Sequence, residues 1–236
     1  MLRSKNMQQR LRHILLPLLL VLFAFACNRN SGKPGQVEAE YIRYRVNYLD
    51  HMAGDIPTSL LPDMMEAYYT KKHVFTRIHG YFGQFSLVQV ADLRKNTVTT
   101  MLNFFGTKVV HTGKKGEVPA GITQLKNPSL EVTSDTLTVC GMLSTRGIVC
   151  DADGEYDVYF IEDIGIKSPN ITTPYYFIDH VLSDFRVQLS MLKMHLVMFG
   201  HEVRKVDPGM FEIPEAYVPV SRETMEHIIN SLFTKE

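Results

Sequence analysis

The sequence predicts a mainly β domain that ends in one amphipathic helix. Residues 41–48 alternate between apolar and polar side chains, which is typical of a strand with one buried and one solvated face. Short segments of β-forming residues then recur about every ten residues, separated by turn-forming residues. Near the C-terminus the apolar residues change to the i, i+3, i+4 spacing of a helix.

The first predicted element is an export signal over residues 1–26. It starts with basic residues and no acidic ones, continues as an apolar run over residues 14–26, and finishes in small residues. The run is too short to span a bilayer comfortably as a permanent helix, so a secretory signal peptide is predicted. We therefore expect the protein to be exported.

The residues Ala24-Phe25-Ala26-Cys27 resemble the lipobox of bacterial lipoproteins. The resemblance implies that Cys27 is acylated and becomes the first residue of the mature protein. Two or more acyl chains hold a domain stably at a membrane. Asn28 in the next position implies, by Gram-negative sorting rules, an outer-membrane lipoprotein facing the periplasm. The alternative is an ordinary signal peptide cut near Ala26, with Cys27 left as a free thiol.

The composition of the remaining chain fits one domain of ordinary size. Of 25 Lys and Arg residues, four lie in the first 26 residues, so residues 27–236 carry a net charge of −4 against 25 Asp and Glu. A mildly acidic chain lacks the basic surface that nucleic acid requires, so no nucleic-acid partner is expected. Residues 27–38 are polar and rich in turn formers, and are predicted to be a flexible tether to a single β-rich domain at 39–236.

The strands of this domain are predicted from their β-forming residues. In the first, Ile42, Tyr44 and Val46 share the buried face, while Arg43 and Arg45 share the solvated one. Residues 148–150 and 156–161 form a hairpin, because Asp-Gly at its turn adopts positive φ readily. The other predicted strands are 64–69, 74–79, 85–90, 98–104, 108–111, 130–133, 137–140, 181–189 and 194–206.

Two further segments have other predicted conformations. Residues 122–125 are predicted to form a helical turn. Ser221 is a suitable N-cap, and Glu223 lies in the first turn of the helix that follows. Its apolar face is made by Met225, Ile228, Ile229, Leu232 and Phe233.

The order of strands, the run 156–170 and the segment 211–217 before the final helix resemble secreted and lipoprotein families of Gram-negative bacteria, including the GLPGLI-type proteins. These are related in shape to the incomplete β-barrels of lipoprotein carriers such as LolA, LolB and LppX. The resemblance implies a strongly curved antiparallel sheet with a helix or loop on its concave side. It supplies no catalytic residue.

No catalytic, cofactor or metal motif appears in the sequence. The histidines form no H-x-x-x-H or H-x-H grouping, there is no C-x-x-C, and G-x-S-x-G, phosphate-loop and dinucleotide fingerprints are absent. Asp151 and Asp153 precede Gly154 as in a calcium loop, but the glycine comes too early, so a hairpin turn is favoured. We therefore expect no enzyme activity, no cofactor and no metal.

Cys140 and Cys150 allow two interpretations. An exported protein can form a disulfide between them, provided that the chain turns enough to bring their Cα atoms within reach. Otherwise they are two buried, inert thiols.

Methionine and aromatic residues indicate candidate contacts for an apolar ligand. Methionine adapts its shape and is common where varied apolar partners are bound. A curved sheet lined in this way could hold a lipid, an acyl chain or an apolar peptide, with mouth loops at 80–83 and 168–176. The alternative is a filled core in a structural or interaction lipoprotein of an envelope assembly. The candidate contacts are Tyr81, Phe82, Phe85, Tyr175, Tyr176, Met191, Met194 and Met198.

Overall fold

The fold was analysed in a computed structural model, which describes residues 35–80 and 83–233. The chain divides into two units, Met1–Gly35 and Gln36–Glu236, and the second contains the domain. The predicted signal peptide, Cys27, residues 27–34 of the tether, Tyr81 and Phe82 lie outside the described residues. The first strand starts at Val37, within the residues assigned to the tether.

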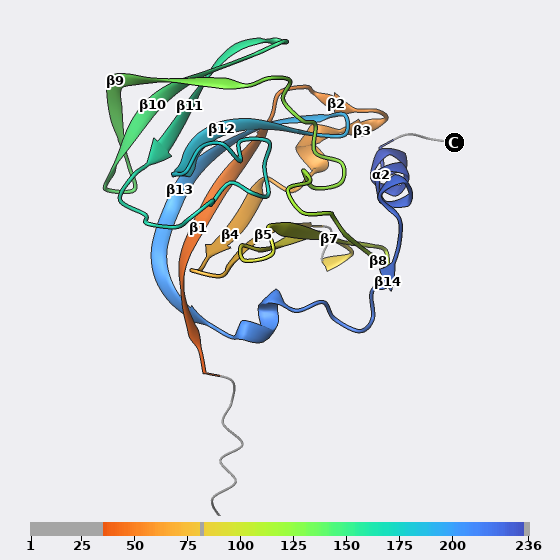
Figure 1. The fold of residues 1–236 in the computed structure, drawn as a ribbon. Helices are drawn as coiled ribbons and strands as arrows, with labels where there is room; N and C mark the ends of the chain where they lie inside the picture. The colour runs from red at the N-terminus through yellow and green to blue at the C-terminus, as the bar shows by residue number, and fades with distance from the viewer. Residues whose placement is uncertain (1–34, 81–82, 234–236) are drawn as a thin grey trace, which may run out of the picture. The chain divides into compact units, whose positions relative to one another are not determined.

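One large sheet dominates the domain. Its order is β14-β8-β7-β6-β5-β4-β1-β13-β12-β11-β10-β9 (Figure 1). Every pairing is antiparallel except that of β14 with β8, which is parallel. In the described residues β9 and β14 are the two ends of this order, so the sheet is not a closed barrel. The mainly β prediction and the large antiparallel sheet are thereby confirmed.

The strand bounds agree closely with the prediction in most places. The strands of the first half are β1 (Val37–Tyr48), β4 (Met64–Tyr69), β5 (His73–Gly80), β6 (Phe85–Asp92), β7 (Thr97–Phe104) and β8 (Thr107–Thr112). Those of the second half are β9 (Ser129–Val139), β10 (Met142–Asp151), β11 (Gly154–Ile161), β12 (Val181–Leu189), β13 (Leu192–Val206) and β14 (Val218–Pro219). A separate small hairpin consists of β2 (Met52–Ala53) and β3 (Ile56–Pro57).

Three local predictions need correction. Residues 130–133 and 137–139 belong to one strand, β9, whose register with β10 shifts at Thr145/Gly147; residue 140, predicted as strand, lies in the turn that follows. The strand β10 starts six residues before the predicted Ile148, at Met142. Residues 122–125 form no helical turn; Ile122 instead makes an isolated bridge to Leu189, which fixes this loop against the sheet.

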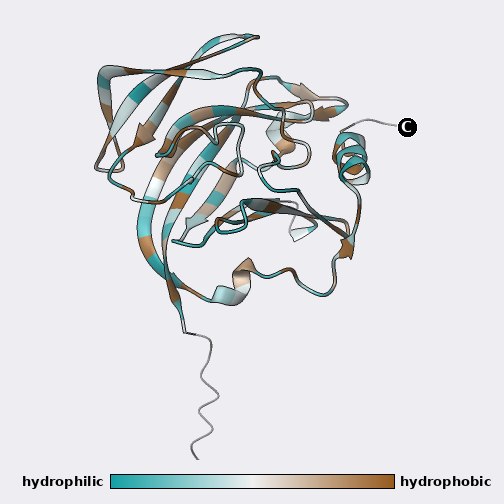
Figure 2. Cartoon of the chain, viewed as in Figure 1, coloured by the Kyte–Doolittle hydropathy of each residue, from teal (hydrophilic) through white to brown (hydrophobic). Residues whose placement is uncertain are grey.

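The C-terminal helix is confirmed. Helix α2 spans Arg222–Ser231, and the side chain of Ser221 accepts a hydrogen bond from the backbone N–H of Thr224, as an N-cap does. Met225 and Ile229 are fully buried on the apolar face of the helix. Figure 2 shows polar residues on the rest of α2 and alternating polar and apolar residues along the strands.

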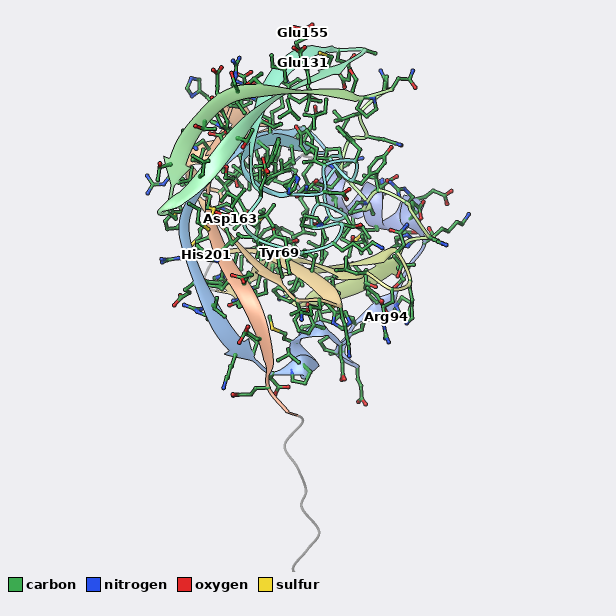
Figure 3. The ribbon with its side chains drawn as sticks, turned by 60° about the vertical axis from the view of Figure 1, so that its left-hand side comes forward. Tyr69, Arg94, Glu131, Glu155, Asp163 and His201 are labelled. Carbon is green, nitrogen blue, oxygen red and sulfur yellow. The ribbon has the colours of Figure 1, made fainter. Side chains whose placement is uncertain are left out.

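The main core lies between the two halves of the sheet and helix α2. It joins residues of β6 and β7, such as Leu87 and Leu102, with residues of β11 and β12, such as Phe160 and Phe185. Tyr44 of β1 donates a hydrogen bond to the carbonyl of Leu182 at 2.8 Å and contacts the hydroxyl of Tyr69 at 3.2 Å. Figure 3 shows Tyr69 toward the middle of the molecule, whereas Glu131, Glu155 and Arg94 lie at its periphery.

A second, smaller core covers the opposite face of β1 and β4–β8. Its buried residues are Ala39, Tyr41, Tyr68, Phe75, Val88, Val90, Met101 and Val110. The segment after β13 covers them: Phe211, in the 3-10 turn Pro208–Phe211, stacks on His73 at 4.8 Å and meets Phe75 edge-on. The prediction of a solvated second face for the strand at 41–48 holds for Arg45, which is exposed, whereas Arg43 is partly buried and Tyr41 on the same face is buried. The neighbouring strands contribute buried residues on both faces.

Candidate functional site

A cavity of about 230 Å³ lies at one end of the main core. Strands β5–β7 supply one side of it, and the ends of β12 and β13 supply the other. The small hairpin and the C-terminal end of α2 complete the wall. The lining residues are Tyr48, Ile56, Leu61, Pro62, Ile78, Phe85, Leu87, Phe104, Phe105, Leu189, Leu192, Met194, Leu232 and Phe233.

The cavity wall is almost entirely apolar. Among these described lining residues, Tyr48 has the one polar side chain, and its hydroxyl donates to the carbonyl of Pro62 at 2.7 Å. The wall therefore offers hydrocarbon to a ligand and no charge. Phe105 is 65% exposed while it lines the cavity, so the cavity reaches the protein surface.

The two residues that follow α2, Leu232 and Phe233, form one side of this cavity. Phe233 is 6% exposed, and its carbonyl accepts a hydrogen bond from the N–H of Asp55 at 3.3 Å. The hydroxyl of Ser190, in the β12–β13 turn, donates to the side-chain oxygen of Asn230 at 2.5 Å. These contacts fix the helix end without filling the space beside it.

The structure brings some of the predicted ligand contacts together and separates others. Phe85 and Met194 line the cavity. Met191 is partly buried at the edge of the core, and Met198 is buried within it. Neither methionine lines the cavity. Tyr81 and Phe82 lie outside the described residues, next to Phe85 in the sequence.

The two tyrosines of the predicted second mouth loop have different surroundings. Tyr175 is buried, and its hydroxyl donates to the carbonyl of Arg186 at 2.5 Å; burial raises the pKa of this phenol. Tyr176 is 51% exposed. Neither lines the apolar cavity.

Several lining residues were not predicted. Ile56 belongs to a two-residue strand, and Leu61 and Phe105 lie in turns, so none has a periodic pattern around it. Leu232 and Phe233 were predicted on the buried face of the C-terminal helix, but not as cavity residues. Both line the cavity, so the apolar spacing at the end of the helix was the available sequence signal.

Cys140 and Cys150 are not joined in a disulfide. Both are free; Cys140 lies in the β9–β10 turn, two residues before β10 begins, and Cys150 is the second-last residue of β10. A ten-residue strand at about 3.3 Å per residue separates them by roughly 30 Å, far beyond disulfide reach. Cys140 is exposed and Cys150 is partly exposed, so the alternative of two buried thiols is also wrong.

The Asp-Gly sequence forms the predicted hairpin turn. Asp151 pairs with Gly154, whose φ of 139° is open to glycine but not to other residues without strain. No group of three His, Cys, Asp or Glu side chains within residues 35–80 and 83–233 is arranged to hold a metal ion. In the same ranges no helix has the length and apolar character needed to cross a membrane.

A buried ionic network lies on the opposite face of the sheet. Glu66, 8% exposed, accepts hydrogen bonds from the Tyr41 hydroxyl at 2.7 Å and from the Arg77 guanidinium at 2.9 and 2.5 Å. Burial alone would raise the pKa of Glu66, but these donors outweigh it and hold the pKa below its usual value. Burial and the adjacent carboxylate raise the pKa of Tyr41 to about 12. The network joins β1, β4 and β5.

Comparison with known proteins gives a likeness of fold only. No family model and no curated protein matches the sequence. A solved structure of PNGF-II, in space group C2, matches with a TM-score of 0.51 and 12% identity over 81% of this chain and 32% of that chain. A second PNGF-II structure, in space group P21, gives a TM-score of 0.48 and 11% identity over 83% and 33%. The chain thus spans about a third of the PNGF-II chain.

Proposed function

We propose that this protein is an exported, lipid-anchored protein of the bacterial cell envelope that binds an apolar ligand without catalysing a reaction. The apolar cavity that reaches the surface is the observation that supports ligand binding most directly. In this proposal the two halves of the sheet act as one strongly curved, incomplete barrel of the lipoprotein-carrier kind, with α2 and the loops closing its concave side.

The size of the cavity limits the ligand. Drug-sized ligands usually occupy pockets of about 300–1,000 Å³, and this cavity, at about 230 Å³, is smaller. It suits one hydrocarbon chain or one large apolar side chain of a peptide better than a whole phospholipid. Each Å² of apolar ligand surface transferred from water to this wall contributes about 25 cal/mol to binding.

The role of the cavity in ligand binding is tested with a variant whose larger side chain fills it. In Leu192→Phe the larger ring occupies ligand space, so lipid that co-purifies with the native protein, identified by mass spectrometry, falls several-fold. Leu143→Phe is the matched control, because Leu143 is 57% exposed on β10 and away from the cavity. Native protein that carries no lipid and binds none added would refute the ligand-binding role.

The anchor is tested at Cys27. Incorporation of labelled acyl chains is expected in the native protein and is lost in Cys27→Ser, which then leaves the membrane fraction. Equal membrane association of both proteins would refute anchoring through this residue.

A second candidate function has its own structural support. The strand β9 is the free end of the twelve-stranded sheet, and over the described residues it pairs with β10 alone. Val132 and Leu137 on it are 56% and 37% exposed. An extended apolar strand of a partner protein could pair with this edge, as expected of an interaction lipoprotein in an envelope assembly. Thr136→Pro would then abolish a complex isolated with the native protein, whereas cavity-filling variants would not.

A further inference from the structure

Four polar side chains form a row across the interior face of β5–β8. Thr76 lies opposite Gln89, Gln89 opposite Thr100, and Thr100 opposite His111 in the registers of the three strand pairs. Thr76, Gln89 and Thr100 are 7%, 6% and 1% exposed. A buried polar row of this length is costly unless its groups are hydrogen-bonded.

The row faces the main core and not the outer one. Residues two apart on a strand share a face, and Leu87, Leu102 and Val109, each two residues from a member of the row, belong to the main core. The strand neighbours on the other face, Val88, Val90 and Met101, belong to the outer core. The polar groups therefore point to the same side as the apolar cavity.

Hydrogen bonding along the row is incomplete. The Thr76 hydroxyl donates to the Gln89 side-chain oxygen at 3.4 Å, a long hydrogen bond. The hydroxyl of Thr100 and Nε2 of His111 are buried without a partner in the described residues, although Nδ1 of His111 contacts the carbonyl of Val220 at 3.1 Å. Thr100 and His111 line neither the apolar cavity nor the compartment beside it, so the groups of the row within reach of a guest are Thr76 and Gln89, whose mutual hydrogen bond is long and leaves capacity for a better partner.

Part of this row lines a small compartment beside the apolar cavity. The compartment measures about 40 Å³, and most of its wall is apolar. Its polar side chains are Tyr69, Thr76, Gln89, Asn170, Thr172 and Thr173. Ile78, Leu87, Leu189 and Met194 line both this compartment and the apolar cavity, so the two spaces are adjacent.

We propose that the two compartments together bind an amphipathic ligand with an uncharged polar end. The hydrocarbon part occupies the apolar cavity, and a hydroxyl, ester or amide oxygen reaches the compartment at Thr76 and Gln89. A group about the size of one water molecule fits a space of this volume. This inference rests on the proposed ligand-binding function and adds to it the chemical class of the ligand.

The absence of cations from the walls determines the charge of the ligand. Neither compartment has a Lys or Arg among its described lining residues. An ionised carboxylate or phosphate placed there would lose its hydration without gaining a counter-ion, which is expensive in an apolar interior. A fatty acid anion is therefore a poor ligand, and an alcohol or ester of the same length is a good one.

The experiment compares three ten-carbon probes that differ only at one end: decane, decan-1-ol and decanoate. Binding is measured by equilibrium dialysis at neutral pH with full-length Cys27→Ser protein, which lacks the acylation site. We expect decan-1-ol to bind at least tenfold more tightly than decane and decanoate to bind most weakly. Thr76→Val and Gln89→Leu should each remove most of the preference for decan-1-ol over decane.

Thr99→Val is the matched control, because the Thr99 hydroxyl bonds that of Thr112 in an exposed pair, away from the row. It should keep the native preference. Equal binding of decane and decan-1-ol, or an alcohol preference that survives both variants, would overturn the inference and leave the apolar cavity as a ligand site; ordered water would then account for the polar row. Tightest binding of decanoate would also overturn it. Binding of none of the three probes would refute the inference and the proposed function together.

Discussion

Gly54 lies directly against the carbonyl group of Phe233. A Cβ atom at position 54 would be 1.7 Å from the Phe233 oxygen, and the φ of Gly54 is 57°. The β2–β3 turn and the end of helix α2 therefore fit together only because residue 54 has no side chain. This contact holds the helix end that lines the apolar cavity.

Gly54→Ala tests this contact. The substitution adds backbone strain of about 1 kcal/mol and a clash with backbone that cannot move without undocking the helix end, so a loss of about 2–3 kcal/mol in the free energy of unfolding is expected. Urea denaturation measures it. Gly106→Ala is the control, since Gly106 also has positive φ, 87°, but nothing within 4 Å of its Cβ position. Equal losses in the two variants would contradict the role assigned to the contact.

The pH dependence of stability should reveal the buried Glu66. Because the folded protein holds the pKa of Glu66 below the ordinary value of 4.5, the stability gained from this group is present above pH 4.5 and is lost as pH falls through the lower folded pKa. The native protein should therefore progressively lose its advantage over Glu66→Gln as the pH falls below 4.5. Urea unfolding of both proteins between pH 3 and 7 checks this. A constant difference across that range would show that the carboxylate charge is not the stabilising feature.

Tyr44→Phe should destabilise the junction between β1 and β12. It leaves the buried carbonyl of Leu182 without its donor, at a cost of about 1–3 kcal/mol. Tyr69→Phe should cost less, because the hydrogen bond recorded for its hydroxyl is the longer one to Tyr44. The comparison of the two unfolding free energies is the measurement, and the reverse order would count against this assignment.

The two cysteines of the domain should both react with an alkylating reagent as free thiols. In non-reducing mass analysis of full-length Cys27→Ser protein, both are alkylated, and the exposed Cys140 reacts faster than Cys150. Because no disulfide contributes to stability, Cys140→Ser should unfold at the native urea concentration. A large loss of stability in Cys140→Ser would indicate a bridge that the structure does not contain.

Local sequence patterns predicted most of the strands and the helix, because strand alternation and helix capping involve residues that are close together in the sequence. The strand Val181–Leu189 and the N-cap at Ser221 follow from alternation and from capping chemistry. The continuity of β9 did not follow: the interruption predicted between residues 133 and 137 is a shift of register within one strand, and local alternation does not distinguish such a shift from a turn between two strands.

The candidate site was less predictable, because it depends on which segments meet. The cavity joins Ile56, Phe104, Leu192 and Phe233, residues that lie far apart in the sequence. Methionines predicted as ligand contacts divided between cavity wall and packed core, as at Met194 and Met198, although both are apolar positions of the same strand. Composition alone does not distinguish a lining side chain from a packed one.

The pairing of β1 with β13 has a consequence for the order in which the chain folds. Val37 pairs with Val206, so the first strand of the sheet acquires one of its two neighbours only after nearly the whole polypeptide has been made. Pairing residues so far apart in the sequence requires a long loop to close, and the conformational entropy lost in closing it slows folding. In the export that we propose, the chain would pass through a translocation channel in extended form, and this late pairing would keep the native topology from assembling while the C-terminal quarter is still missing.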